Sequence, residues 1–178
     1  MDKVTNIRSC AIIGCGNVGA ATAYALMHSK LLSKMVLIDV NKKKAMGEAE
    51  DISHSLPFNA PMEIIAGDYE DISDCGIVII TAGVNQTPGQ TRIDLLQKNA
   101  QIFRSIVDNI VKYNREAVIL VVTNPVDVLT YITLERSGLP SSQDSWRNSW
   151  PGSGKNPPLP TWSWPSSPCC PAPVCTTP

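Results

Sequence analysis

Residues 9–19 read SCAIIGCGNVG, and this stretch decides the fold. An apolar run stops at a glycine cluster, which is typical of a buried strand that ends in a tight turn. Residues 17–30 continue as an alanine-rich segment whose apolar positions recur at helical spacing. A second apolar run at residues 35–40 carries Asp39 near its end, 20 residues after Gly19. The sequence therefore predicts a strand, a glycine turn, a helix and a second strand that ends at an acid.

The glycines of this turn follow the spacing G-x-G-x-x-G, which is typical of dinucleotide-binding turns when a strand precedes it and a helix follows. In such a turn Gly14 permits the sharp bend, Gly16 lets the backbone approach a pyrophosphate, and Gly19 permits close packing of helix on strand. The free N–H groups at the helix N-terminus favour the phosphates. Asp39 accepts hydrogen bonds from an adenosine ribose and repels a 2′-phosphate, which favours NAD over NADP. The alternative is an ordinary glycine turn beside a solvated acid.

Further apolar runs follow at residues 62–66, 76–81 and 117–122, and segments of helical periodicity separate the runs. The helical segments span 41–54 and about 92–113, and a last helix opens near Pro125 and ends at Gly138. Near-continuous Val/Ile/Leu runs are typical of strands that are buried on both faces. Because they alternate with helices, we expect an α/β fold with a doubly wound parallel sheet of the Rossmann type. The pattern stops after five strands, so we expect a truncated sheet that lacks a sixth.

The composition favours one soluble domain. The chain has 178 residues, of which 43% are hydrophobic and 17% charged, and its net charge is -1. This charge gives no reason to expect nucleic acid or an anionic membrane as a partner. The sequence shows neither a signal peptide nor an apolar run of about 18 residues, so we expect a cytoplasmic protein. Cys10, Cys15 and Cys75 lie in or beside apolar runs, which predicts buried, reduced thiols.

Two longer segments, TAGVNQTPGQTRID at residues 81–94 and VVTNPVDVLTY at 121–131, add to GCGNVG at 14–19. Together they resemble the lactate/malate dehydrogenase family, and within it the bacterial-type NAD-dependent L-lactate dehydrogenases. The resemblance covers residues 8–143. It implies NAD as the cofactor, pyruvate or L-lactate as the small-molecule substrate, and a full-length protein that is homo-oligomeric.

The resemblance also implies the substrate contacts. In the family the loop at residues 84–92 closes over the substrate, and Arg92 matches the catalytic arginine that polarises the substrate carbonyl. Gln86 matches the position that reads the far end of the substrate, where malate dehydrogenases place an arginine. A neutral glutamine tolerates the methyl group of pyruvate, so Gln86 favours lactate over malate, and a malate dehydrogenase-type enzyme is the alternative. Asn124 matches a contact to both the nicotinamide carboxamide and the substrate, and Asp127 matches a substrate contact.

The same matching implies a set of NAD contacts that lie mostly at strand ends. They are Gly14, Gly16, Val18, Gly19, Asp39, Lys44, Tyr69, Gly83, Val84, Ser105, Val122 and Asn124. The proton donor of the family is a histidine held by an aspartate, and both are expected downstream of position 143. His28 and His54 match neither of these positions. We therefore expect this chain alone to be inactive.

Residues 144–178 differ in composition from residues 1–143, and we treat them as a separate tail. All four tryptophans, nine of the fourteen prolines and three of the six cysteines lie there. One hypothesis is a disordered interaction tail, in which PPLP at 157–160 is a polyproline II ligand. The chain would then be a non-catalytic NAD-binding or interaction protein. Another is a small cysteine-rich module at 169–175, although an adjacent cysteine pair with no nearby histidine is a poor zinc template, so no metal is expected.

A third hypothesis for the tail is a shift of reading frame near codon 144. Members of the family continue with a G-T-V-L-D-x-A-R run at this point. Translation one nucleotide forward from Trp146 permits G-x-T-V-G-L-D-x-A-R-I, which is close to that run. We favour this hypothesis, under which the tail is out of frame and unstructured. Residues 1–143 are then an incomplete dehydrogenase that does not form the oligomer of the family.

Overall fold

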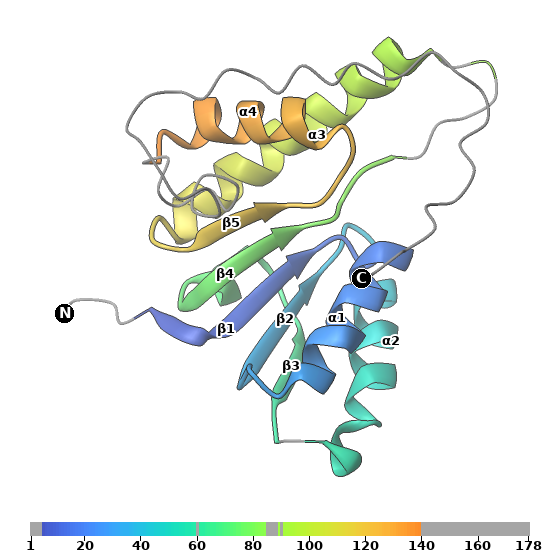
Figure 1. The fold of residues 1–178 in the computed structure, drawn as a ribbon, viewed down its shortest axis with the longest axis vertical. Helices are drawn as coiled ribbons and strands as arrows, with labels where there is room; N and C mark the ends of the chain where they lie inside the picture. The colour runs from blue at the N-terminus through green and yellow to red at the C-terminus, as the bar shows by residue number, and fades with distance from the viewer. Residues whose placement is uncertain (1–4, 60, 85–88, 90, 140–178) are drawn as a thin grey trace, which may run out of the picture.

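The computed structural model describes residues 5–59, 61–84, 89 and 91–139. Five strands form one parallel sheet in the order β3-β2-β1-β4-β5 (Figure 1). The chain therefore leaves β1 first toward one edge of the sheet and later, from β4 on, toward the other. The predicted doubly wound α/β fold is confirmed. The strands are β1 (Asn6–Ile13), β2 (Lys34–Ile38), β3 (Glu63–Ala66), β4 (Cys75–Ile80) and β5 (Val118–Val121).

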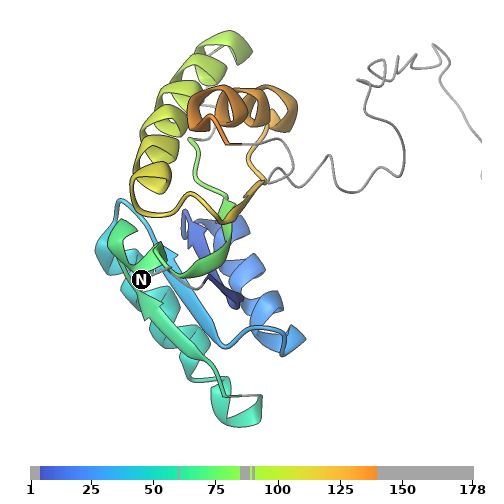
Figure 2. The ribbon, with the colours of Figure 1, turned by 90° about the vertical axis from the view of Figure 1, so that its left-hand side faces the viewer.

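Two layers of helices cover the sheet because each central strand is apolar on both faces. Along β1, Cys10 and Ile12 belong to the core with α1 (Asn17–Ser29) and α2 (Lys42–Ser53). Ala11 and Ile13 belong to the core with α3 (Arg92–Tyr113) and α4 (Val126–Ser137). This alternation follows from the period of two along a strand. Figure 2 shows α3 and α4 packed together, apart from α1 and α2.

Local signals set several ends of the helices. Thr91 caps α3, since its hydroxyl accepts from the N–H of Asp94 at 3.2 Å while the Asp94 carboxylate accepts from the N–H of Thr91 at 3.2 Å. This reciprocal capping box satisfies donors that a helix start leaves unpaired. At the other end of the domain, α4 stops at Gly138, whose φ of 60° is left-handed. The predicted glycine end of this helix is confirmed.

The structure also departs from the sequence prediction in two places. β1 begins at Asn6 rather than at residue 9, although Asn6, Ile7 and Arg8 are exposed. This segment is a strand because it pairs with β4, where Asn6 lies opposite Cys75. Its side chains are exposed, so no apolar run in the sequence marks it as a strand. Two short 3-10 helices, η1 (Leu56–Phe58) and η2 (Tyr69–Ile72), were not predicted because they are too short to show a periodicity.

The three cysteines of the described chain are free and buried, as predicted. None of the described helices is long and apolar enough to cross a membrane. Within the same residues, no group of three or more His, Cys, Asp or Glu side chains is placed to hold a metal ion. The tail at 144–178 lies outside the described residues.

Candidate functional site

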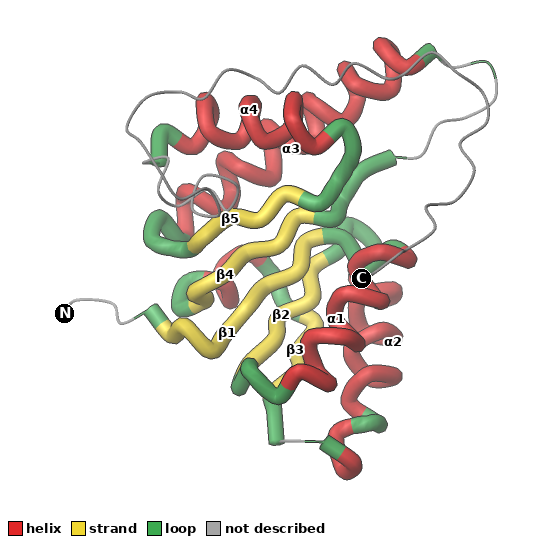
Figure 3. The backbone as a smooth tube through the Cα atoms, in the orientation of Figure 1, coloured by secondary structure: helices red, strands yellow, loops and turns green. Residues whose placement is uncertain are grey.

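The predicted site residues gather where the strands end. In a parallel sheet all carboxyl ends lie at one edge, and a ligand binds where the strand order reverses. Here the reversal lies between β1 and β4 (Figure 3). Gly14 follows β1, Asp39 follows β2, and Gly83 and Asn124 come shortly after β4 and β5. The fold therefore brings together residues that are as much as 110 positions apart in the sequence.

Two glycines of the turn are required by close packing. Gly14 has a φ of 105°, and a Cβ there would lie 2.5 Å from the backbone nitrogen of Ala82. A Cβ on Gly19 would collide with the carbonyl oxygen of Gly14 and lie 2.9 Å from the Thr81 hydroxyl. Any side chain at either position would push the first turn of α1 away from β1 and β4. The sharp turn predicted at Gly14 and the close packing of helix on strand predicted at Gly19 are confirmed.

Gly16 is different, because no heavy atom of the described residues lies within 4 Å of the place where its Cβ would be. It is the N-cap residue of α1 and offers no side chain to bond the first N–H groups of that helix. These donors and the positive end of the helix dipole face open space above the turn. A pyrophosphate fits this cradle, since a ligand can approach the backbone where a side chain would otherwise stand.

Asp39 is held at the side of the same turn. One carboxylate oxygen accepts from the N–H of Cys15 at 2.7 Å, and the other accepts from the N–H of Asn41 at 2.8 Å. Each oxygen retains acceptor capacity, so the carboxylate can also bond the two hydroxyls of a ribose. Its negative charge disfavours a phosphate on either hydroxyl. The geometry fits the adenosine ribose of NAD.

Burial makes the Cys15 thiol structural. Burial and, to a smaller extent, the nearby carboxylates of Asp39 and Glu48 together raise the pKa of Cys15 to about 11. The thiol therefore stays protonated near neutral pH, and its sulfur lies 3.8 Å from the Ile38 carbonyl oxygen. A protonated, buried thiol is a poor nucleophile and a poor metal ligand.

The segment that follows β4 is fixed by three polar side chains that the sequence analysis missed. The Thr81 hydroxyl donates to the Gly14 carbonyl at 2.7 Å, and the Thr123 hydroxyl donates to the Ala82 carbonyl at 2.9 Å. The buried Asn99 of α3 accepts from the N–H of Val84 at 2.9 Å. The signal for Asn99 was present, since it occupies a position of the apolar stripe of α3, four residues before the buried Phe103.

The remaining predicted cofactor contacts lie at different distances from this centre. Val18 is exposed on the first turn of α1, and Lys44 is exposed on the first turn of α2. Val122 follows β5, and its N–H bonds the Ile80 carbonyl at 3.0 Å. Tyr69 lies beyond the end of β3 in η2, where burial raises its pKa. Ser105 is exposed in the middle of α3, and among the described residues no hydrogen bond joins it to the glycine turn.

The predicted substrate contacts are described only in part. Asn124 is exposed after β5, and Asp127 is exposed in the first turn of α4. Gln86 lies outside the described residues. Arg92 is the first residue of α3, and its side chain also lies outside the described part.

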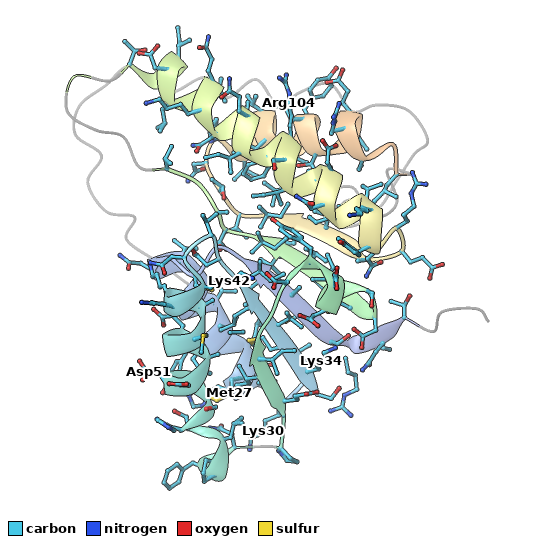
Figure 4. The ribbon with its side chains drawn as sticks, turned by 180° about the vertical axis from the view of Figure 1, so that it is seen from behind. Met27, Lys30, Lys34, Lys42, Asp51 and Arg104 are labelled. Carbon is cyan, nitrogen blue, oxygen red and sulfur yellow. The ribbon has the colours of Figure 1, made fainter. Side chains whose placement is uncertain are left out.

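Neither histidine lies at the carboxyl edge. His28 is in the last turn of α1, which begins at the edge and runs away from it for about 18 Å. There its ring meets Tyr24 edge-on at 4.5 Å between centroids. Figure 4 shows Lys30, two residues after His28, far from Lys42, which begins α2. His54 caps the far end of α2. Neither histidine therefore lies near the predicted cofactor and substrate contacts.

Fold and site together define a dinucleotide-binding domain. The model of one protein family, the lactate/malate dehydrogenase NAD binding domain, matches residues 9–144. The chain belongs to the lactate/malate dehydrogenase family, a family of oxidoreductases that act on small molecules, and it carries the NAD-binding domain of that family.

Named relatives agree with this assignment. An L-lactate dehydrogenase of Acetivibrio thermocellus is 53% identical over 137 residues, which are 77% of this chain and 43% of the relative. An L-lactate dehydrogenase of Clostridium botulinum is 50% identical over 143 residues, which are 80% of this chain and 45% of the relative. The chain thus spans less than half the length of these relatives.

Solved structures from both branches of the family are similar. A lactate dehydrogenase from a deep-sea metagenome library of the Medee basin has a TM-score of 0.75 and 44% identity, over 78% of this chain and 45% of its own. The malate dehydrogenase of Archaeoglobus fulgidus in complex with NADH has a TM-score of 0.72 and 36% identity, over 76% of this chain and 47% of its own. The fold alone therefore does not separate the two substrates.

Proposed function

We propose that residues 1–143 are the NAD-binding half of an L-lactate dehydrogenase, which interconverts pyruvate and L-lactate in the cytoplasm during fermentation or anaerobic glycolysis. The observation that carries the choice of substrate is Gln86, where a malate enzyme has an arginine. Sequence identity agrees, since two similar lactate dehydrogenase structures are 44% and 43% identical and two malate dehydrogenase structures are 30% and 36% identical.

In this proposal the cofactor lies along the carboxyl edge of the sheet. Asp39, at the end of β2, bonds the adenosine ribose, and the first turn of α1 with Gly16 bonds the pyrophosphate. Gly83, Val84 and Asn124, which follow β4 and β5 on the other side of the reversal point, would hold the nicotinamide half. Bound NADH supplies the hydride that reduces the carbonyl carbon of pyruvate.

At the substrate, Arg92 polarises the carbonyl oxygen and stabilises the negative charge that develops there. Gln86 contacts the methyl end of pyruvate without a charge, while Asn124 and Asp127 complete the substrate contacts. These roles rest on the match of the motifs at 81–94 and 121–131. Because neither His28 nor His54 lies at this edge, we propose that the chain binds NADH but does not turn over pyruvate.

A chimera tests the proposal as a whole. Residues 1–143 are fused to the part of the Acetivibrio thermocellus enzyme that follows the aligned region, and the rate of NADH oxidation is measured with pyruvate and with oxaloacetate. We expect kcat/KM to be higher with pyruvate in the chimera, and no turnover by the 178-residue chain. A chimera that prefers oxaloacetate would establish the malate alternative, and pyruvate reduction by the purified chain would overturn the predicted inactivity.

The Gln86→Arg version of the chimera is the matched variant. A new charge-assisted hydrogen bond to the second carboxylate should raise kcat/KM for oxaloacetate relative to pyruvate by about tenfold or more. An unchanged ratio would show that Gln86 does not read the far end of the substrate.

We also propose that residues 144–178 are an out-of-frame translation. Sequencing the gene across codon 144 tests this. Two results would contradict it: an intact frame through codon 178 with no dehydrogenase coding downstream, or a partner protein whose binding depends on the tail.

A further inference from the structure

Asn99 is one of the few polar side chains buried in the described chain, with 2% of its surface exposed. It lies in the apolar stripe of α3, between that helix and the segment that leaves β4. A buried amide is unfavourable in such a place unless its polar atoms are bonded. Its oxygen accepts from the N–H of Val84 at 2.9 Å and would lie 3.4 Å from a Cβ on Gly83.

The same short segment is held from its other side by the end of β5. The Thr123 hydroxyl donates to the Ala82 carbonyl at 2.9 Å, and its methyl carbon would lie 2.6 Å from a Cβ on Gly83. Residues 82–84 are therefore bonded at both ends, by Thr123 at Ala82 and by Asn99 at Val84. The bond at Val84 is made by a helix that contributes nothing to the glycine turn or to Asp39.

The order of the strands decides which half of the cofactor meets this segment. Asp39 follows β2, on one side of the glycine turn, and residues 82–84 follow β4, on the other side. A dinucleotide whose adenosine ribose lies at Asp39 therefore places its nicotinamide half beside Gly83 and Val84.

We propose that Asn99 is a positioning residue for the nicotinamide half of the cofactor. By holding the N–H of Val84, it fixes the backbone that this half lies against, and it leaves the adenosine half untouched. It also ties that backbone to α3, whose first residue is Arg92, seven positions before Asn99. This inference rests on the proposed function, since it assumes that NAD binds along the carboxyl edge.

Asn114 provides a matched control. It is the other buried asparagine of the described chain, with 6% of its surface exposed, and it caps the C-terminal end of α3. Its amide nitrogen donates to the carbonyls of Ile72 at 2.7 Å and Cys75 at 2.8 Å. Its oxygen accepts from the N–H groups of Glu116 and Ala117, both at 3.0 Å. All of these partners lie at the amino edge of the sheet or beside it, so Asn114 stabilises the fold without reaching the site.

The experiment compares two ligands on the 178-residue chain. ADP carries the adenosine and pyrophosphate groups only, whereas NADH also carries the nicotinamide half. Dissociation constants are measured by calorimetry for ADP and by fluorescence for NADH, at a temperature where each variant is folded. For Asn99→Leu, which keeps the branched shape of the side chain and removes the acceptor, we expect NADH to bind about tenfold more weakly while ADP binding is unchanged.

Two further variants separate positioning from stability. Asn99→Asp keeps an acceptor oxygen in either protonation state, so it should recover most of the lost NADH affinity. Asn114→Leu should lower the melting temperature and leave the ratio of the two dissociation constants at the wild-type value. If Asn99→Leu does not fold, Asn99→Ser makes the same comparison, because its short hydroxyl does not reach Val84.

Failure of this inference is distinguishable from failure of the proposed function. If the wild-type chain binds neither ligand, the proposed NAD site is overturned. If the wild-type chain binds both, and Asn99→Leu weakens both equally or neither, the positioning role is overturned and the NAD site stands.

Discussion

Replacing Gly19 by alanine is expected to destabilise the fold, although alanine is the better helix former. The added methyl group would collide with the carbonyl oxygen of Gly14. That carbonyl belongs to a turn whose Gly14 N–H bonds Ile38 at 2.7 Å, so it is not free to move aside. Overpacking of this kind costs about 1–3 kcal/mol.

Two smaller effects act in opposite directions. The methyl group would also displace the Thr81 hydroxyl from Gly14, a hydrogen bond of 2.7 Å that contributes about 1 kcal/mol. The higher helix propensity of alanine raises the unfolding free energy by about 1 kcal/mol. These two nearly offset each other, so the net loss of unfolding free energy for Gly19→Ala is about 1–3 kcal/mol.

Gly47→Ala is the matched control, because Gly47 lies in α2 with no atom within 4 Å of its missing Cβ. There only the propensity acts, and the substitution should stabilise the fold by about 0.5–1 kcal/mol. Urea unfolding followed by circular dichroism gives both values from the shift of the midpoint at constant slope. If both substitutions stabilise the protein, the turn at Gly14 can move to make room for a methyl group at position 19, and the predicted collision is refuted.

Three further predictions concern the turn, the cofactor and pH. Gly16→Ala should change the unfolding free energy by less than about 0.5 kcal/mol, because its Cβ meets open space, yet calorimetry should find ADP binding about tenfold weaker; equal ADP affinity would remove the pyrophosphate from this position. Asp39→Asn should raise the affinity for NADPH relative to NADH by about tenfold in a fluorescence titration, and an unchanged ratio would contradict a contact to the ribose. Hydrogen bonds from Thr91 and Arg136 lower the pKa of Asp94 and Asp108 respectively, so their stabilising effect is present above the unfolded pKa and is lost as pH falls through the folded pKa. The urea midpoint should therefore fall on acidification, and less steeply in Asp94→Ala; identical pH profiles for the two proteins would contradict this.

Most of the fold could be predicted from the sequence, because the signals that set each strand and helix are local. The apolar run at 76–81 is buried on both faces as β4, and the apolar stripe of α3 predicted that helix from about 92 to 113. The start of β1 was wrong by three residues, because Asn6 is a strand residue only through its pairing with Cys75. A pairing between positions 69 apart leaves no periodicity in either segment.

Part of the candidate site could likewise be predicted from local patterns, and part of it could not. The glycine spacing and Asp39 are local patterns, and the structure places them around one turn. Thr81, Thr123 and Asn99 escaped prediction because each acts on a carbonyl or an N–H of another segment, which the sequence does not bring near. A polar residue in an apolar helical stripe, as at position 99, is nevertheless a readable signal, since burial there calls for a bonding partner.

Binding and turnover should therefore separate in this chain. The residues proposed for the adenosine half, Gly16 and Asp39, belong to a turn that is held by contacts within the first 41 residues and by Thr81 and Ala82, which follow β4. Those proposed for the nicotinamide half depend on Asn99 and Thr123, which come from α3 and the end of β5. Chemistry needs in addition a proton donor, and neither His28 nor His54 lies at that edge. Binding of the adenosine half therefore needs mainly the first part of the chain, and binding of the nicotinamide half needs α3 and the end of β5 as well. Turnover needs a proton donor in addition to both.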